Sequence, residues 1–543
     1  MSFSDLVTSV LQNDTRLSLL AMRPELVLCA TIIAILSLKV LAPNWKKAAF
    51  YLAAAGLIVA GAFAYADARG ISTSHSIFTG MLVADSFTAV LRLAILGFAL
   101  LFVAFAEIAA NSQDDMTEFY VLVLGALIGM CLMISANHVL LVFLGVEMAS
   151  VPSYVLAGLK RRQSKSSEAA MKYAVFGAGT AGIMLFGLSL LAGTLGAANL
   201  PAMAAKLAAM IEHGMAGDQI TVLSLGALMV MVGVAFKLSA VPFHFWAPDV
   251  FEGATAEVAA FLSVASKAAA LGLLLRLCGG FAFPTDLYFH PGGAPSPQID
   301  PSALAALQPV RQYLVALISV LAAVTCTFGN LAAYGQTNMK RLLAYSTIAH
   351  AGYMMMPVAA AVALVGTNQD AARGAVASLV GYIGIYLFMN LAAFAIVAFL
   401  RNATGSEEIS AYGGLVRRSP GLAVCMAIVM FSLVGLPPLA GFQAKWVIFG
   451  SVIEAARVNH GLWALLFVGL LNTVLSLFYY LRVVRVMVLS PEPLHREAPT
   501  IPLTSMVGFY CAMLTSPMLL LFFALDGFSH WANAAASTLF FFR

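Results

Sequence analysis

Apolar runs of about 20 residues, separated by short polar segments, follow one another along almost the whole chain. A helix needs about 20 mainly apolar residues to cross the hydrocarbon core of a bilayer. The pattern therefore predicts about 14 membrane-spanning helices and leaves almost no sequence for a soluble domain. Their approximate ranges are 24–42, 47–66, 85–108, 117–136, 138–158, 170–194, 220–240, 255–279, 312–334, 342–364, 374–400, 420–455, 462–489 and 502–526.

Two of these runs contain helix breakers beside a charged residue, which is Lys237 in the first and Lys445 in the second. Pro242 ends the run near 220–240, and Pro437 with Pro438 interrupts the run near 420–455. Proline removes a backbone hydrogen bond, and the freed carbonyls are tolerated in a membrane only where protein or water satisfies them. Broken helices at corresponding positions in two halves are typical of transporters built from inverted repeats.

We therefore predict an all-α polytopic membrane protein with two inverted repeats of about five helices each. The two longest predicted linkers are 195–219 and 281–311, of which the second is rich in proline and glycine. The expected organisation is an N-terminal part (1–110), a first repeat (115–280), an extramembrane linker (281–311), a second repeat (312–490) and a C-terminal span (491–543).

The composition excludes several classes of protein. Of 543 residues, 61% are hydrophobic and 10% charged, and the mean hydropathy is +0.92. Soluble domains carry about 25% charged residues, so this chain cannot build a water-soluble surface. A net charge of +4 is too small for a nucleic-acid binder. The six cysteines lie singly in apolar runs without a CxxC pair, so no zinc or iron–sulfur site is predicted.

Lysine and arginine in the loops indicate the orientation of the chain. If the N-terminus lies outside, the loops predicted on the inside hold more of these residues than those outside. Cytoplasmic loops are enriched in Lys and Arg, so both termini are expected on the outer side of the membrane. The first apolar run follows Arg23 and Glu25 without a clear cleavage site, and it is therefore expected to be a retained span.

Four charged residues lie within the apolar runs: Glu147, Lys237, Lys267 and Lys445. A charge at the centre of a bilayer costs about 2.5–3.5 kcal/mol, so each is a candidate for function. Lys267 has about ten apolar residues on either side, which makes escape to the membrane surface difficult. Lys39, Arg92 and Arg276 lie nearer the ends of runs, where a snorkelling side chain or a satisfied ion pair explains them.

These residue types suit proton transfer. Burial favours the neutral form of a lysine, and a nearby carboxylate favours the charged form. At ~4 Å and an effective dielectric constant near 20, the attraction is about 4 kcal/mol. A change in the distance between Glu147 and Lys237 would therefore switch the lysine between holding and releasing a proton.

Three further residues form a second tier of candidates. His244 follows Lys237 by seven residues and so shares its helical face, and His350 lies within another apolar run. Either could relay protons or serve as a hydrogen-bonded structural histidine. Lys172 is expected at a cytoplasmic end of a span, where the enrichment of basic residues explains it, although a role as a lateral link remains open.

Several segments together resemble subunit N of proton-pumping NADH:quinone oxidoreductase (respiratory complex I), one of its antiporter-like membrane subunits. The segments are EAAMKY (168–173), AFKLSAVPFHFWAPDVFEG (235–253), FLSVASK (261–267), NMKRLLAYSTIAHAGY (338–353) and GLPPLAGFQAK (435–445). The resemblance runs from about 85 to 490, and the PDVFEG run looks more like subunit N than like its paralogues L and M. The linker 281–311 is longer than the family leads us to expect.

The resemblance implies a fold of about 14 spans with a hydrated axis of charges at mid-membrane. Glu147 and Lys237 resemble the coupling pair, Lys267 the central relay lysine, and Lys445 the lysine facing the neighbouring pump subunit. The chain would translocate protons as part of an enzyme while binding no redox centre itself. NADH, FMN, iron–sulfur clusters and quinone are expected in other subunits. The expected partners are subunits M, A, J and K and membrane lipids, in the cell inner membrane.

Other functions remain open from the sequence. A stand-alone or Mrp-type cation/proton antiporter would need an acidic cation site at mid-membrane, for which only Glu147 is available. The same type of subunit also fits a ferredoxin- or hydrogenase-linked complex. A membrane scaffold that no longer pumps is a further alternative, against which the retention of all four buried charges argues.

Overall fold

The computed structural model describes residues 15–42, 44–45, 47–71, 74–110, 116–160, 163–282, 301–493, 499–537 and 539, and for 525–528 the backbone alone. Within these ranges, thirteen helices are long and apolar enough to cross a membrane. They are α3 (Arg23–Leu41), α4 (Ala48–Gly70), α5 (Ser86–Ala109), α6 (Met116–Ser135), α7 (Val139–Ala157), α8 (Ser164–Leu195), α10 (Gly217–Leu238), α12 (Ala256–Ala282), α14 (Gln308–Ala333), α15 (Met339–Leu364), α16 (Gln369–Thr404), α20 (Leu462–Leu489) and α21 (Met506–Phe523). The predicted all-α polytopic membrane fold is confirmed.

Shorter elements join and interrupt these helices. They are α2 (Thr15–Ala21), β1 (His75–Ile77), β2 (Leu82–Ala84), α9 (Leu200–Glu212), α11 (Trp246–Gly253), α13 (Pro301–Ala306), the 3-10 helix η2 (Ile409–Tyr412), α17 (Leu415–Arg418), α18 (Pro420–Val434), α19 (Ala440–Val458) and α22 (Leu525–Ala536). β1 and β2 form an antiparallel hairpin.

The predicted run at 420–455 is two helices, α18 and α19, on either side of the proline pair. Counted as one interrupted crossing, this pair accounts for the fourteenth predicted span. The linker predicted at 195–219 lies between α8 and α10, and about half of it forms the short helix α9. The linker predicted at 281–311 is bounded by Ala282 and α13, and residues 283–300 lie outside the described residues.

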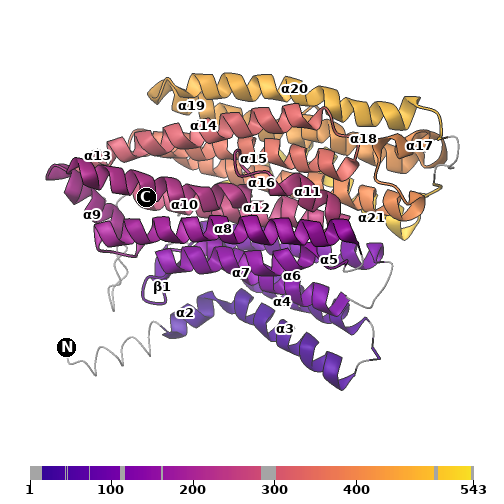
Figure 1. Cartoon of the computed structure of the whole chain (residues 1–543), viewed down its shortest axis with the longest axis horizontal. Coiled ribbons are helices and arrows are strands. Elements are labelled where there is room, and N and C mark those ends of the chain that lie inside the picture. The colour runs from indigo at the N-terminus through magenta and orange to yellow at the C-terminus, as the bar shows by residue number, and fades with distance from the viewer. Residues whose placement is uncertain are drawn as a thin grey trace.

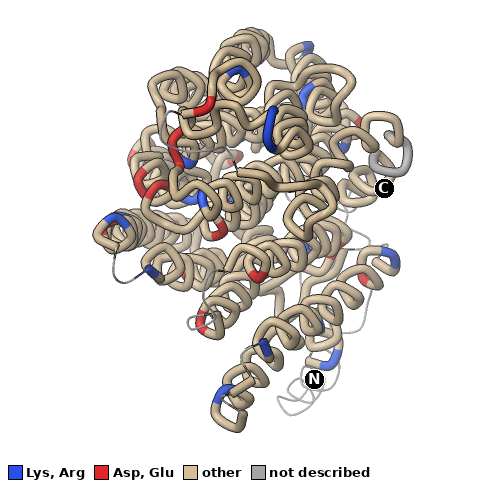
Figure 2. The backbone as a smooth tube through the Cα atoms, turned by 90° about the vertical axis from the view of Figure 1, so that its right-hand side faces the viewer, with Lys and Arg blue, Asp and Glu red and all other residues tan. Residues whose placement is uncertain are grey.

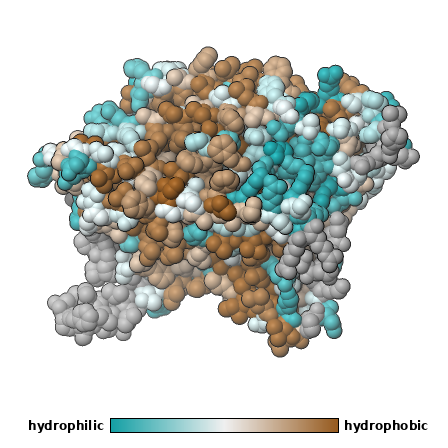
Figure 3. All heavy atoms as spheres, in the orientation of Figure 1, coloured by the Kyte–Doolittle hydropathy of each residue, from teal (hydrophilic) through white to brown (hydrophobic). Residues whose placement is uncertain are grey.

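The helices lie side by side with similar directions, from α3 at one edge to α20 at the other (Figure 1). A hydrophobic band covers the middle of the surface, and hydrophilic residues gather toward the two ends of the helices (Figure 3). Seen along the helices, from the side on which α17 lies, charged residues are scattered over the exposed end of the bundle (Figure 2). This distribution is the one expected for helices that cross a membrane.

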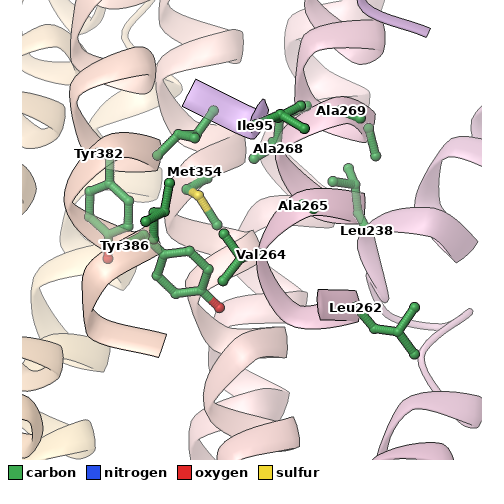
Figure 4. Packing of buried hydrophobic residues seen from close by; sticks show 14 of the residues in the cluster. Ile95, Leu238, Leu262, Val264, Ala265, Ala268, Ala269, Met354, Tyr382 and Tyr386 are labelled. Carbon is green, nitrogen blue, oxygen red and sulfur yellow. The ribbon is translucent and has the colours of Figure 1, made fainter. Parts of the chain in front are cut away.

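Helices α12, α15 and α16 form the centre of the molecule and are almost completely buried. Figure 4 shows Val264, Ala265 and Ala268 of α12 facing Met354 of α15 and Tyr386 of α16. Small residues such as the alanines of α12 allow helix backbones to approach closely in a membrane. Lys267 of α12 and His350 of α15 are consequently almost fully buried, each with 1% of its surface exposed.

Lys39, Arg92 and Arg276, the three cations near the ends of spans, are all ion-paired. The sequence left open whether they snorkel to the membrane surface or form ion pairs. Arg92 of α5 contacts Glu25 of α3 at 2.7 Å, with both side chains almost fully buried. Arg276 of α12 contacts Asp85 at 2.6 Å and also donates to the Ile134 carbonyl. Lys39 pairs with Glu118. These pairs tie the N-terminal helices and α12 to their neighbours.

Replacement of Arg276 by leucine should destabilise the fold, because Asp85 would remain buried without its cation. Removal of one partner of a buried ion pair costs about 3–5 kcal/mol. We expect Arg276→Leu to lower the thermal unfolding temperature of the detergent-solubilised protein. Arg457→Leu is the control, since its pair with Glu454 is exposed. Equal unfolding temperatures for the two variants would contradict the prediction.

Candidate proton-transfer site

Lys237 lies in the last turn of α10, where the helix ends at Ser239 in the left-handed conformation. Pro242 prevents the helix from continuing, and the chain resumes as α11 at Trp246. The Val241 N–H, which the break exposes, donates to Thr325 Oγ1 of α14 at 3.0 Å. The Lys237 side chain is 2% exposed, and its Nζ has no hydrogen-bond partner among the described residues.

Glu147 of α7 is half-buried and interacts electrostatically with Lys237. The two side chains do not form an ion pair in the described structure, and Glu147 Oε1 is unpartnered. The sequence-predicted pair is therefore within electrostatic range but not in contact. A movement that brings the two together would strengthen their attraction, since Coulomb energy grows as distance falls.

Lys267 lies in the middle of α12 and is 1% exposed. Its Nζ donates a hydrogen bond of 2.8 Å to the backbone carbonyl of Thr347 on α15. No carboxylate of the described residues forms an ion pair with it. The lysine thus has a polar partner but no counter-ion, and it points into the protein interior instead of toward the membrane surface.

Lys445 of α19 reaches back across the proline break to the end of α18. Its Nζ donates to the carbonyls of Leu433 (3.1 Å) and Val434 (2.9 Å) and lies 4.4 Å from the centroid of the Tyr353 ring. The last carbonyls of a helix lack partners within the helix and carry partial negative charge. The broken helix and the aromatic face therefore both favour a cation at this position.

His350 of α15 lies between Lys267 and Lys445 and interacts electrostatically with both. Its Nδ1 is 2.6 Å from the Tyr382 hydroxyl, and its Nε2 is 3.2 Å from the Tyr480 hydroxyl. Thr347, His350 and Tyr353 are spaced three residues apart and so share a face of α15. This face connects the central lysine to the lysine of α19.

The other second-tier residues lie apart from this face. His244, between α10 and α11, is buried against the Phe328 ring, with its centroid 4.4 Å away and Nδ1 unpartnered. Lys172 of α8 is partly exposed and contacts Asp249 at 2.6 Å and Glu168 at 2.7 Å. The structure therefore brings together Lys267, His350 and Lys445, and separately Glu147 and Lys237.

A network of charges fixes α11 at one end of the bundle. Arg341 of α15 contacts both Asp249 and Glu252 at 2.8 Å, and the Lys340 Nζ donates to the Glu252 and Ala254 carbonyls. Burial tends to raise the pKa of Asp249, but hydrogen bonds from Lys172 and Arg341 hold this pKa below its usual value. Asp249 is therefore anionic at neutral pH and joins α8 to α15 through α11.

Residues 136–284 and 302–476 match the family described as NADH:quinone oxidoreductase/Mrp antiporter, membrane part. The chain belongs to this family. Subunit N of NADH-quinone oxidoreductase from Anaeromyxobacter sp. (strain Fw109-5) is 37% identical, with 92% of each chain covered. Subunit N of F(420)H(2) dehydrogenase from Methanosarcina mazei is 35% identical, covering 88% of this chain and 91% of that protein. The resemblance to complex I subunit N is confirmed.

Solved structures agree with this assignment. A chain of respiratory complex I from Thermus thermophilus is 28% identical, with a TM-score of 0.68 and coverage of 92% of this chain and 96% of that one. A chain of the Mrp complex from Dietzia sp. DQ12-45-1b has a TM-score of 0.75, 19% identity and coverage of 96% and 98%. At that identity, the second likeness shows the shared fold alone.

Sequence reasoning missed the partners of the lysines and of His350, which are Thr347, Tyr353, Tyr382 and Tyr480. The signal for two of them was present, because Thr347 and Tyr353 precede and follow His350 at helical spacing. Tyr382 and Tyr480 lie on distant helices and resemble ordinary packing residues. Among the described residues, no group of three or more His, Cys, Asp or Glu is arranged to hold a metal ion.

Replacement of Lys445 by methionine should loosen the break between α18 and α19. It leaves the Leu433 and Val434 carbonyls without the ammonium donor, and a hydrogen bond to a charged group is worth about 1.5–3 kcal/mol. We expect the backbone amides of residues 435–442 to exchange with deuterium about tenfold faster in Lys445→Met. In the control Lys206→Met, exchange of the amides of residues 435–442 should be unchanged, because Lys206 donates to the Gly196 carbonyl and not to the break. Equal exchange in both variants would show that Lys445 does not hold the break.

Proposed function

We propose that this chain is the proton-translocating membrane subunit, subunit N, of an NADH:quinone oxidoreductase. Protons move along an axis at mid-membrane formed by Glu147, Lys237, Lys267 and Lys445. His244, His350 and Lys172 form a second tier. Quinone reduction in other subunits supplies the free energy. Family membership and the similarity to subunit N along most of the chain support this assignment.

The observation that carries the proposal is the burial of Lys267 at the centre of α12, where none of the described carboxylates pairs with it. An ammonium group in an apolar interior is costly, and desolvation favours its neutral form. A single carbonyl contact compensates only part of this cost. Lys267 can therefore gain and lose a proton in response to modest changes in nearby charge, which a pump requires.

In the first half of the axis, a change in the distance between Glu147 and Lys237 would alter the charge near Lys237. Approach of the carboxylate to ~4 Å would stabilise the Lys237 ammonium by about 4 kcal/mol at an effective dielectric constant near 20. Withdrawal would favour release of the proton toward Lys267. In the second half, the carbonyls at the end of α18 favour the charged form of Lys445. Displacement of α18 from α19 would remove these contacts and favour release of the proton.

We assign residues 115–280 and 312–490 to the two inverted repeats, flanked by 1–110 and 491–543. Each contains one interrupted helix, α10 with α11 and α18 with α19. Lys237 lies in the last turn of α10, before its break, whereas Lys445 follows its own break and contacts the carboxyl end of α18. Each repeat therefore has a lysine beside an interrupted helix.

NADH, FMN, iron–sulfur clusters and quinone bind to other subunits under this assignment. The partners in the membrane are the antiporter-like subunit M and the small subunits A, J and K, with lipid around them. The chain lies in the cell inner membrane with both termini on the outer side, so that the end carrying α17 and the α11 charge network faces inward. The enrichment of cytoplasmic loops in basic residues supports this orientation.

A second candidate is the same subunit in a complex with a different electron donor. The similarity to subunit N of the F(420)H(2) dehydrogenase favours keeping this alternative. The subunits that co-purify in mild detergent decide between the two, because the electron-input subunits differ. A stand-alone antiporter would instead purify alone and exchange cations for protons in vesicles.

The proposed function predicts that Lys267→Ala abolishes or sharply reduces proton translocation in an assembled complex, because the central proton-carrying group is gone. The measurement is the number of protons moved per electron in vesicles, beside the rate of NADH oxidation. Lys206→Ala, an exposed lysine outside the axis, is the control. Undiminished proton-to-electron stoichiometry in Lys267→Ala would refute the proposal.

A further inference from the structure

A cavity of about 580 Å³ lies among the ends of four helices, α14, α15, α19 and α20. It is at the end of the bundle where α13 lies, opposite α17 (Figure 1). The first turn of α14, the α15–α16 turn and the α19–α20 turn line it, and their polar side chains include Gln308, Arg311, Gln312 and His460. A cavity of this size can hold a small molecule or the head group of a lipid.

Arg311 brings a positive charge to this cavity. Its side chain is half-buried, and its Nη1 donates to the carbonyls of Leu304 at 2.8 Å and Ala282 at 3.3 Å. No carboxylate of the described residues forms an ion pair with Arg311, in contrast to Arg92 and Arg276. Because a guanidinium group stays charged and has five N–H donors, Arg311 retains donors for an anionic oxygen.

An exposed apolar ridge on α14 begins at the cavity. Gln312 lines the cavity, and the exposed side chains that follow it at intervals of four residues are Ala316, Val320, Val324 and Phe328. Residues four apart form a continuous ridge along a helix. At 1.5 Å per residue, this ridge extends about 24 Å along α14, which exceeds half of the hydrocarbon thickness of a bilayer.

A second exposed ridge, on α20, begins at the same cavity. His460 lines the cavity, and the exposed apolar side chains that follow it at intervals of three or four residues are Trp463, Phe467, Leu471, Val474 and Phe478. The two helices are neighbours, since Asn330 of α14 bonds Asn472 of α20 and the rings of Tyr334 and Phe478 lie 6.3 Å apart. Two apolar ridges thus lead away from one cavity that carries a cation.

This combination matches the chemistry of an anionic phospholipid. A free anion would compensate the charge of Arg311 but would leave both ridges unused. An uncharged lipid would cover the ridges but would leave the arginine without a counter-ion. A lipid with a negatively charged head group satisfies both parts of the surface, because charge attraction and burial of apolar area act on different parts of one molecule.

We propose that the cavity binds the head group of an anionic phospholipid whose two acyl chains lie along the α14 and α20 ridges. The Arg311 guanidinium donates to a phosphate oxygen, and Gln308, Gln312 and His460 supply further hydrogen bonds to the head group. The lipid joins the start of α14 to the α19–α20 turn. This site is separate from the proton axis and goes beyond the proposed function.

Native mass spectrometry of the full chain in mild detergent, titrated with phosphatidylglycerol, tests the site. Arg311→Gln should weaken binding of the tightest lipid about tenfold, because the hydrogen bonds from guanidinium to phosphate are lost. Arg311→Lys should bind within about threefold of the unaltered protein, because the charge is retained. Arg457→Gln is the matched control, since Arg457 lies at the same end of the bundle but is exposed and paired with Glu454. Its binding should be unchanged.

A second variant covers the case in which Arg311→Gln does not fold. Gln312→Glu keeps the size of an exposed side chain and places a negative charge in the cavity. Repulsion of the phosphate and competition for Arg311 should weaken phosphatidylglycerol binding about tenfold. Gln219→Glu, at the start of α10 and outside the cavity, should bind like the unaltered protein.

Two further probes identify the ligand. Inorganic phosphate should not displace the tightest lipid, because it has no acyl chains to cover the ridges. Phosphatidylcholine should bind more weakly than phosphatidylglycerol, because its head group has no net charge. Displacement by inorganic phosphate, or equal binding of the two lipids, would overturn the proposal.

Unchanged phosphatidylglycerol binding in Arg311→Gln, or in Gln312→Glu where the first variant does not fold, would also overturn the proposal. So would a cryo-electron microscopy map of the complex in which a helix of a partner subunit fills the cavity. None of these results affects the proposed function, which Lys267→Ala tests separately.

Discussion

An ammonium group buried in a bundle of apolar helices needs polar atoms that the surrounding lipid and side chains cannot supply. For two of the buried lysines the backbone supplies them. Lys267 takes the Thr347 carbonyl, and Lys445 takes two carbonyls at the end of α18. Carbonyl dipoles stabilise a cation less than a carboxylate does, so the lysines are retained in the interior without being fixed in one charge state. A full ion pair would favour the charged form of these lysines more strongly and would hinder the proposed release of a proton.

Arg276 and Arg92 show the contrast within the same molecule. Each is buried in the interior like the axis lysines, but each contacts a carboxylate at 2.6–2.7 Å. An arginine remains charged at any physiological pH, and its planar group suits a carboxylate. Arg92 and Arg276 therefore have counter-ions where a charge holds helices together, whereas Lys267 and Lys445 of the proposed axis contact carbonyls.

Much of the fold and part of the site could be predicted from the sequence. Hydropathy located the spans, and the charges that interrupt it located Glu147, Lys237 and Lys267, since a charge in an apolar run is costly and is rarely retained without a function. The partners of these residues could not be predicted in this way. Tyr382 and Tyr386 lie on α16, whose polar side chains are few and whose tyrosines look like packing material. Only the packing of α15 against α16 shows that Tyr382 and Tyr386 contact His350.

The breaks after α10 and α18 place two features beside the lysines: unsatisfied helix carbonyls and the charge network around α11. A continuous helix would satisfy its carbonyls internally and would offer Lys445 nothing to bind. α11, the segment beyond the first break, is held by Asp249 and Glu252 against α8 and by Lys340 and Arg341 against α15. α15 carries Thr347, His350 and Tyr353 on one continuous helix with these cations. α15 therefore joins the charge network at the end of the bundle to the residues that contact Lys267 and Lys445 at its centre.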